Sequence, residues 1–367
     1  MHISAPGKLF LSGEWAILET GNSGIVAAVN KRVHVEIEKS KEISVSVDDF
    51  NIKNVKAEYR CGKIEWLNVN EEQKEKLVFM KGALEAAMNY LGDNKSYKIR
   101  SWGEESQIEV DGKKKKIGFG SSAASVVAAV AGVLAVNNID ITKRKNKDII
   151  YKLSAIAHYL AQGKIGSGFD IAASTYGGIF VYKRFDPKWL EDQIKEKTIK
   201  EVAETKWTGF VVEELKIPED FQLLIGWTKT SASTTDMIKQ MNVFKTQNPE
   251  NYKKLISKIS DIAAESEKSW KQNNKKEILK LIQENEKALA ALGKESGVNI
   301  ETPDLKKLSD IANKNGGAGK LSGAGGGDCG IGVCYRKKTA DKIKQEWKKA
   351  GIWVLDAEID NDGIVVY

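Results

Sequence analysis

The stretch GFGSSAAS, residues 118–125, holds residue types that can bind phosphate. Gly118 and Gly120 allow a ligand to approach the backbone closely. Ser121 is suited to the N-cap of a following helix, whose unpaired N–H groups and positive dipole end would face an anion. The serine hydroxyls could also ligate Mg²⁺, which prefers oxygen. The loop therefore predicts a site for the phosphates of a nucleotide.

Two familiar nucleotide-binding loops do not fit this stretch. A Walker A loop needs a lysine directly after its second glycine, and none is present. Gly118, Gly120 and Ala123 match the dinucleotide fingerprint formally, and Asp140 follows twenty residues after Gly120. The preceding residues, DGKKKK, are not the buried strand which that fingerprint requires. A different kind of phosphate loop is therefore favoured.

Basic and glycine-rich segments accompany this loop. Lys113 and Lys114 are expected in a solvent-exposed turn, and Lys115 and Lys116 are candidates for phosphate contact. Near the N-terminus, APGKLFLSGEWAIL places Lys8 after a Pro-Gly turn. Later in the chain, SGAGGGDCGIGV places five glycines within residues 323–330, before an expected strand. Either segment alone could be an ordinary tight turn, but the three together point to one phosphate-handling site.

The composition excludes several other classes of protein. Hydrophobic residues make up 41% and charged residues 29% of the 367 residues, which is typical of a soluble globular protein. The longest apolar segment, 123–136, is shorter than the roughly 20 residues that span a bilayer. No signal peptide is evident at the N-terminus. Three cysteines do not make a disulfide framework, so a cytoplasmic location is expected.

The charges argue for a small anionic substrate rather than nucleic acid. The net charge of +7 comes from 57 basic and 50 acidic residues that are mostly interleaved along the chain. A diffuse excess of this kind does not form the one-sided basic face of a nucleic-acid binder. The three histidines and three cysteines show no HxxH or CxxC spacing, so neither a zinc site nor a Ser-His-Asp triad is expected.

Strand and helix patterns occur in both halves of the chain. VHVEIE and ISVSV alternate with period two, and FQLLIGWT (221–228) has the composition of a buried strand. Residues 71–92 are expected to form one helix that ends at a glycine. Further helices are expected at 235–245, 250–272 and 275–292. An α/β or α+β protein follows, divided near Ile217 and Pro218 into domains 1–217 and 218–367.

Taken in order, the three motifs resemble those of the GHMP kinases, the family of galactokinase, homoserine kinase, mevalonate kinase and phosphomevalonate kinase. APGKLFLSGEWAIL is similar to the first motif, GFGSSAAS to the phosphate loop, and SGAGGGDCG to the third motif. The resemblance covers nearly the whole chain. It implies an α+β fold with an N-terminal ATP-binding domain, a ferredoxin-like C-terminal domain, a site in the cleft between them, and ATP and Mg²⁺ as cofactors.

Within the family, the chain most resembles the phosphomevalonate kinases. Trp15 stands in GEWAIL where mevalonate kinases usually have histidine, and IGSGFDIAASTYGG and LLIGWTKTSASTTDMIKQM are also similar to that branch. The implied reaction transfers the γ-phosphoryl group of ATP to 5-phosphomevalonate, giving 5-diphosphomevalonate in the mevalonate pathway of isoprenoid synthesis. The alternatives are a mevalonate kinase, a diphosphomevalonate-type decarboxylase, and a non-catalytic regulator or nucleic-acid binder on the same scaffold.

The resemblance also implies roles for individual residues. Asp170 matches the catalytic aspartate, and Lys8 matches the lysine near it and near the transferred phosphate. Residues matching the nucleotide loop are Gly118, Phe119, Gly120, Ser121, Ser122 and Ala123, with Ser121 or Ser122 toward Mg²⁺. Expected substrate contacts, besides Lys8, are Trp15, Lys116, Ser167, Ser231, Ser322, Gly323, Ala324 and Gly325.

Three questions stay open at this point. Mevalonate kinases carry a Mg²⁺-binding glutamate eleven residues before the aspartate, but Tyr159 stands there in this chain. Either ATP and a serine hold the metal, or another acid does. Asp170 could instead cap a turn or helix. A phosphate acceptor, largely dianionic at pH 7, needs no general base, so Asp170 is expected mainly to orient Lys8 and substrate. His158 and Cys329 are expected to be structural.

Overall fold

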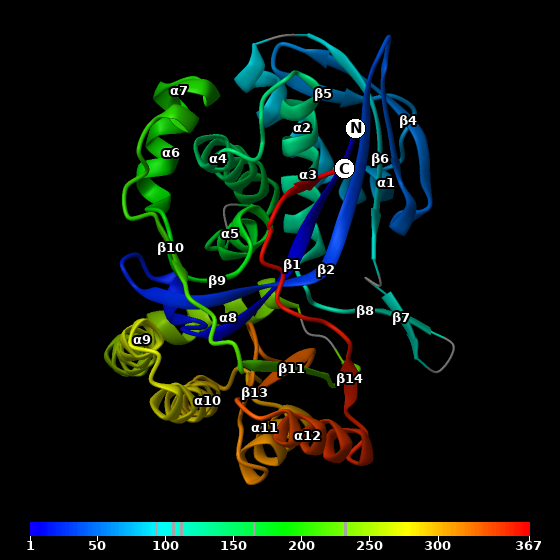
Figure 1. The fold of residues 1–367 in the computed structure, drawn as a ribbon. Coiled ribbons are helices and arrows are strands. Elements are labelled where there is room, and N and C mark those ends of the chain that lie inside the picture. Colours follow the sequence, from blue (N-terminus) through cyan, green and yellow to red (C-terminus); the bar gives the residue numbers. More distant parts are fainter. Residues whose placement is uncertain (93, 105–106, 111–112, 164–165, 231–232) are drawn as a thin grey trace.

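Two β-sheets, stacked on one another through β1 and β2, carry helices on their outer sides (Figure 1). The computed structural model describes residues 1–92, 94–104, 107–110, 113–163, 166–230 and 233–367. Strands and helices both contribute to each half, which confirms the expected α+β fold. The proposed division at residues 217 and 218 stays a prediction.

The larger sheet has nine strands in the described chain, in the order β10-β9-β2-β6-β3-β4-β5, with β1 beside β2 and β15 beside β1. All pairs are antiparallel except β3 with β6. Its strands are β1 (His2–Ser12), β2 (Ser23–Ser40), β3 (Ile43–Val47), β4 (Ile52–Arg60), β5 (Lys63–Trp66), β6 (Ser96–Gly103), β9 (Ile179–Lys183), β10 (Val211–Leu215) and β15 (Val365–Val366).

Helices cover one face of this sheet. The central one, α3, is built of small apolar residues and is buried almost all round, as expected for a helix without a polar face. It packs on β1 and β2 and against three neighbouring helices. The helices of this half are α1 (Glu71–Lys76), α2 (Val78–Leu91), α3 (Ser121–Val136), α4 (Arg144–Ala161), α5 (Phe169–Tyr176), α6 (Pro187–Glu196) and α7 (Ile199–Glu204).

The prediction of a single helix at 71–92 is wrong in one respect, because the structure has two helices, α1 and α2, in this range. Asn70 opens α1 with a capping box, in which its side chain accepts from the Gln73 N–H and the Gln73 side chain accepts from the Asn70 N–H. Leu77 leaves helical geometry between α1 and α2. Gly92 then ends α2 with a φ of 66°, a left-handed conformation that glycine adopts without strain.

The smaller sheet has the order β12-β13-β11-β14 and is antiparallel throughout. With its helices it follows the ferredoxin-like order, in which a strand, a helical segment, two strands, a helix and a strand succeed one another, and the first helical segment consists of four helices; this confirms the expectation for this half. Its strands are β11 (Gln222–Trp227), β12 (Ala318–Leu321), β13 (Cys329–Cys334) and β14 (Trp353–Leu355). Its helices are α8 (Thr234–Gln247), α9 (Pro249–Lys271), α10 (Lys275–Ser296), α11 (Pro303–Lys314) and α12 (Lys337–Lys349).

The two sheets share a hydrophobic core. Side chains such as Leu9 and Ile25 project from the face of β1 and β2 opposite α3. They pack with Trp227 and Ile331 of the smaller sheet. Both faces of β1 are covered, so nearly all of its residues are buried. This packing brings the end of β1 close to the strands and loops of the smaller sheet.

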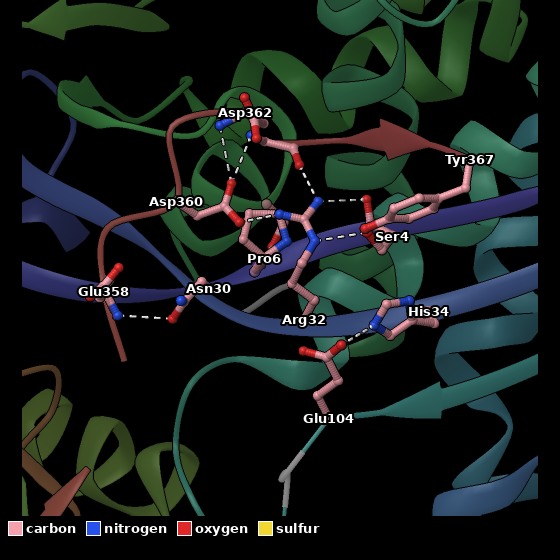
Figure 2. A network of polar contacts seen from close by, with 12 residues as sticks. Ser4, Pro6, Asn30, Arg32, His34, Glu104, Glu358, Asp360, Asp362 and Tyr367 are labelled. Atoms are coloured by element: carbon pink, nitrogen blue, oxygen red, sulfur yellow. Dashed lines mark hydrogen bonds and ion pairs between the residues drawn. The ribbon is translucent and has the colours of Figure 1, made fainter. Parts of the chain in front are cut away.

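The C-terminal segment returns from β14 to the larger sheet, where β15 pairs with β1, so the two chain ends lie near each other (Figure 1). Buried Arg32 fastens this segment, as Figure 2 shows. Its guanidinium donates to the Asp360 carboxylate, to the Gly363 carbonyl and to both oxygens of Ser4. Such a buried charge is tolerable only because every side of it is paired.

A short hairpin of β7 (Gln107–Val110) and β8 (Lys113–Lys116) leads into the next loop. The expectation of an exposed turn at Lys113 and Lys114 is therefore wrong, because cross-strand pairing extends the backbone there. Within the described ranges, no helix is long and apolar enough to cross a membrane. The three cysteines are free thiols, and Cys329 is buried as expected.

Candidate active site

A cavity of about 310 Å³ lies where β1, α3, α5, α8 and the glycine-rich segment before β13 meet. It brings together residues that the sequence places far apart. The predicted site residues that line it are Lys8, Trp15, Gly118, Gly120, Ser121, Ser122, Ser167, Asp170, Ser322, Gly323, Ala324 and Gly325. All three motifs therefore face one cavity.

Of the four other expected residues, two are described and do not line the cavity, and the side chains of two cannot be placed from the described part of the chain. Phe119 and Ala123 are buried in the two cores, so their side chains point away from a ligand. Lys116 belongs to β8, but its side chain is outside what the structure describes. Ser231 also lies outside the described residues. Trp227 at the end of β11 is fully buried in the shared core.

The glycine–serine loop, residues 118–122, is held against β1 by the backbone. The Lys8 N–H donates to the Phe119 carbonyl over 2.8 Å. A Cβ on Gly7 would lie 2.8 Å from that same carbonyl oxygen, so only glycine allows this approach. The Pro-Gly turn seen in the sequence is thus an extended segment of β1 whose glycine admits the loop.

Two helices begin at the cavity. Gly120, with a φ of 81°, is the N-cap of α3, and Gly168, with a φ of 78°, is the N-cap of α5. The expectation that Ser121 caps α3 is therefore wrong, since it is the first helical residue. Asp170 lies in the first turn of α5 and is not its cap. The N-terminal N–H groups of both helices favour an anion here.

Lys8 and Asp170 approach the loop from two sides. The Lys8 ammonium donates to the Gly118 carbonyl over 2.9 Å and lies 5.8 Å from the centre of the Phe169 ring. A Cβ built on Gly120 would be 3.2 Å from Lys8 Cε and 3.8 Å from Asp170 Cβ. A cation and a carboxylate therefore flank one glycine that has no side chain to separate them.

The glycine-rich segment forms the opposite wall. The Ser322 hydroxyl donates to the Phe10 carbonyl, and the Phe10 N–H donates to it over 2.8 Å. The indole N–H of Trp15 donates to the Ala324 carbonyl over 3.1 Å. A Cβ on Gly325 would lie 2.2 Å from the Ile300 carbonyl oxygen, so this turn also requires glycine. These bonds fasten the turn after β1 to the segment before β13.

Asp328 and Glu14 also line the cavity, although sequence reasoning gave neither a role. The Asp328 carboxylate accepts from the Gly118 N–H over 3.0 Å. Burial raises the pKa of Asp328, and the Gly118 N–H and Lys8 oppose that rise. The sequence did offer a signal for Asp328, since it is an acid within a run of glycines. A glycine turn lets a carboxylate come close to other backbone groups.

Tyr159, which stands where mevalonate kinases carry a Mg²⁺-binding glutamate, is not among the residues that line the cavity. Tyr159 is buried, and its hydroxyl donates to Glu191 over 3.0 Å. Its neighbour His158 is also buried, which lowers its pKa, and its Nε2 lies 3.3 Å from the Ser122 hydroxyl. In the part of the chain described, no group of three or more histidines, cysteines and acids is placed to hold a metal ion.

Family models match both halves of the chain. Residues 79–178 match the GHMP kinases N terminal domain, and residues 267–352 match the GHMP kinases C terminal model. The first match contains the glycine–serine loop and Asp170, and the second contains the glycine-rich segment.

Individual proteins resemble the chain over almost its whole length. A phosphomevalonate kinase from Streptomyces sp. is 29% identical and covers 98% of this chain and 97% of its own. The structure of Streptococcus pneumoniae phosphomevalonate kinase in complex with phosphomevalonate and AMPPNP is 25% identical, with a TM-score of 0.82 over 98% of this chain and 99% of its own. A mevalonate kinase from Saccharolobus solfataricus is 25% identical over 98% of this chain and 96% of its own.

Proposed function

The chain belongs to the GHMP kinase family, and on that premise we propose that it transfers the γ-phosphoryl group of ATP to 5-phosphomevalonate, giving 5-diphosphomevalonate and ADP. The main support for this proposal is the similarity over nearly the whole chain to phosphomevalonate kinases. The structure of one of them is of its complex with phosphomevalonate and an ATP analogue. The cavity supports the proposal because it joins a phosphate-type loop, a lysine and an aspartate.

The proposed nucleotide site is the glycine–serine loop with the N-terminus of α3. Its glycines leave room for phosphate oxygens, and the first N–H groups of α3 point toward them. Lys8 beside Gly118 would offset the repulsion between two anionic substrates. Transfer between phosphates consists mostly of positioning and charge stabilisation, which these groups supply.

The acceptor would occupy the part of the cavity between Ser167, Trp15 and Ala324. The Ser167 hydroxyl is buried and has no hydrogen-bond partner among the described residues, so it can serve a ligand. The acceptor phosphate is itself the nucleophile and is largely dianionic at pH 7. Asp170 is therefore proposed to orient the reacting groups, with no proton to remove.

Mg²⁺ accompanies ATP in most kinases, and the oxygen donors of this cavity suit it. We propose Ser121 as its protein ligand, since the Ser122 hydroxyl contacts His158. Asp170 is the neighbouring carboxylate that could take part. The metal would neutralise phosphate charge, and the chain would supply only hydroxyl and carboxylate oxygens.

The test is an ADP-release assay in Mg²⁺-ATP with 5-phosphomevalonate and mevalonate as separate acceptors, with products identified by mass. We expect diphosphomevalonate from phosphomevalonate and no turnover of mevalonate. The similarity to a mevalonate kinase makes mevalonate the competing acceptor. Turnover of mevalonate alone would reassign the acceptor pocket, and CO₂ release with diphosphomevalonate as a third substrate would indicate the decarboxylase instead.

A further inference from the structure

Asp328 links the smaller sheet to the glycine–serine loop across the cavity. It precedes β13, yet its Oδ1 accepts from the backbone N–H of Gly118 over 3.0 Å. A carboxylate thus holds a loop N–H of the kind that binds phosphate oxygens. The sequence separation of 210 residues makes this a contact between the two halves of the molecule.

The backbone of Asp328 is fixed from its own side. Its φ of 64° is left-handed, which is unfavourable for a residue other than glycine, asparagine or aspartate. Its N–H donates to the Thr230 carbonyl over 2.7 Å, and its carbonyl accepts from the Thr228 N–H over 2.9 Å. The backbone from which the carboxylate projects is therefore held in place by the residues that follow β11.

Gly118 is shaped to receive that carboxylate. A Cβ at Gly118 would lie 1.6 Å from Asp328 Oδ2, a distance no side chain can adopt. Gly118 has no positive φ, so the constraint at this position is the space that the Asp328 carboxylate occupies, and any side chain here would have to displace that carboxylate. On its other side, the Gly118 carbonyl accepts from the Lys8 ammonium over 2.9 Å. A continuous path of hydrogen bonds therefore runs from Asp328 through Gly118 to Lys8.

We propose that Asp328 is a positioning residue for phosphoryl transfer: it orients Gly118 so that the carbonyl of this residue holds the Lys8 ammonium against the reacting phosphates. This inference rests on the proposed function of the cavity. A buried carboxylate beside a phosphate site is unfavourable in itself, because it repels the ligand and loses hydration. The hydrogen bond from the Gly118 N–H and the positive charge of Lys8 offset this unfavourable contribution.

The first test compares Asp328→Asn with Asp328→Ala. An asparagine oxygen can still accept from the Gly118 N–H, whereas alanine cannot. Because alanine is also strained at the left-handed φ of this residue, Asp328→Gly, which tolerates that φ and likewise lacks an acceptor, should lose kcat as Asp328→Ala does. We expect Asp328→Ala to lower kcat roughly tenfold to a hundredfold, as a displaced catalytic group does, with a smaller change in KM for ATP. Asp328→Asn should recover most of kcat. An asparagine variant as impaired as alanine, or an alanine variant with normal kcat, would overturn the inference.

A second test needs no acceptor. Hydrogen exchange of the ligand-free protein should speed up at the Gly118 amide in Asp328→Ala, and it should stay slow in Asp328→Asn and in Asp341→Ala, an exposed control on α12. Unchanged exchange in Asp328→Ala would contradict the inference even in a proven kinase. Failure of the wild type to use phosphomevalonate would instead remove the proposed acceptor and leave this result intact.

A double-mutant cycle provides the third test. Gly118→Ala should impair the wild type, because its methyl group collides with Asp328 Oδ2. In the Asp328→Ala background that collision is absent, so the further loss in kcat should be clearly smaller. Equal losses in both backgrounds would mean that the two residues are not coupled.

Discussion

Glu14 and Lys320 form an ion pair in which both side chains are almost completely buried, and it joins the turn after β1 to strand β12. The other Glu14 oxygen accepts from the Asn285 side chain over 2.9 Å, and Lys320 also donates to the Leu321 carbonyl. The pair thus connects the cavity, which Glu14 lines, with strand β12 of the smaller sheet.

Removing one partner of this pair should destabilise the protein strongly. Lys320→Met leaves Glu14 charged and unpaired, so we expect the free energy of unfolding to fall by about 3–5 kcal/mol. The double variant Glu14→Gln with Lys320→Met should recover part of that loss. Urea unfolding measures both, with exposed Lys306→Met, paired to Asp310, as a control that changes stability by less than about 1 kcal/mol. If the double variant lost as much stability as Glu14→Gln and Lys320→Met lose separately when added together, this account would be contradicted.

Lys8→Met should remove most of the activity. The Lys8 ammonium lies at the glycine–serine loop, between the Gly118 carbonyl and the Phe169 ring, where charge on a transferred phosphate has to be stabilised. Removal of one hydrogen-bond donor that stabilises transition-state charge in other enzymes lowers kcat by about 10²–10³-fold, and we expect a fall of the same size here. Exposed Lys41→Met, in the turn between β2 and β3, is the matched control and should keep wild-type kcat. A Lys8 variant altered only in KM would argue against this role.

Asp170→Asn tests whether the aspartate removes a proton. With a phosphate acceptor, we expect kcat to fall while its pH dependence keeps its shape, because no base is needed. A pH–rate profile of both forms gives the answer. Loss of an acidic limb in the variant would show that Asp170 titrates as a base, which would favour an alcohol acceptor such as mevalonate.

Ser167→Ala should weaken acceptor binding without weakening the fold. Its hydroxyl lines the cavity, is buried, and is unpartnered among the described residues, so the ligand-free protein loses no hydrogen bond on its removal. We expect KM for the acceptor to rise about three- to tenfold, as for one lost hydrogen bond. Ser154→Ala in α4 removes another buried, unpartnered hydroxyl away from the cavity and should leave KM unchanged. Equal effects in both variants would contradict a ligand role.

Glu286 should make stability depend on pH. Burial raises its pKa to about 7, while Lys320 and the Ser309 hydroxyl oppose that rise. Because the folded protein holds this proton more tightly than the unfolded chain, whose glutamate pKa is about 4.3, stability should fall as pH rises from about 4.5 to 7. The loss is up to about 4 kcal/mol, and well above pH 7 this group contributes no further change.

Glu286→Gln removes that titration and keeps a hydrogen-bonding group beside Ser309 and the Leu321 N–H. Unfolding free energies at pH 5 and pH 7.5 should therefore differ less in the variant than in the wild type. The same pH dependence in both proteins would assign it to other groups.

Much of the molecule follows from local sequence. The amphipathic segments after Thr228 become α8, α9 and α10 nearly as expected, because apolar spacing and polar caps act within a few residues. Where two local signals competed, the expectation was wrong: Asn70 and Gln73 close a capping box that starts a separate short helix before α2. The lysines before the loop form a strand because β7 offers a partner.

By itself, then, the sequence determined the three segments that meet at the cavity, since glycines, serines, Lys8 and Asp170 sit in motifs readable within about ten residues. Its strand and helix patterns left α/β and α+β open, and the α+β class and the ferredoxin-like half were implied by the resemblance of those motifs to the GHMP kinases. Only the tertiary structure decided how these segments hold one another. The Asp328–Gly118 and Glu14–Lys320 contacts join residues 210 and 306 positions apart. Their formation depends on how the two sheets pack through β1, and no local pattern specifies that packing.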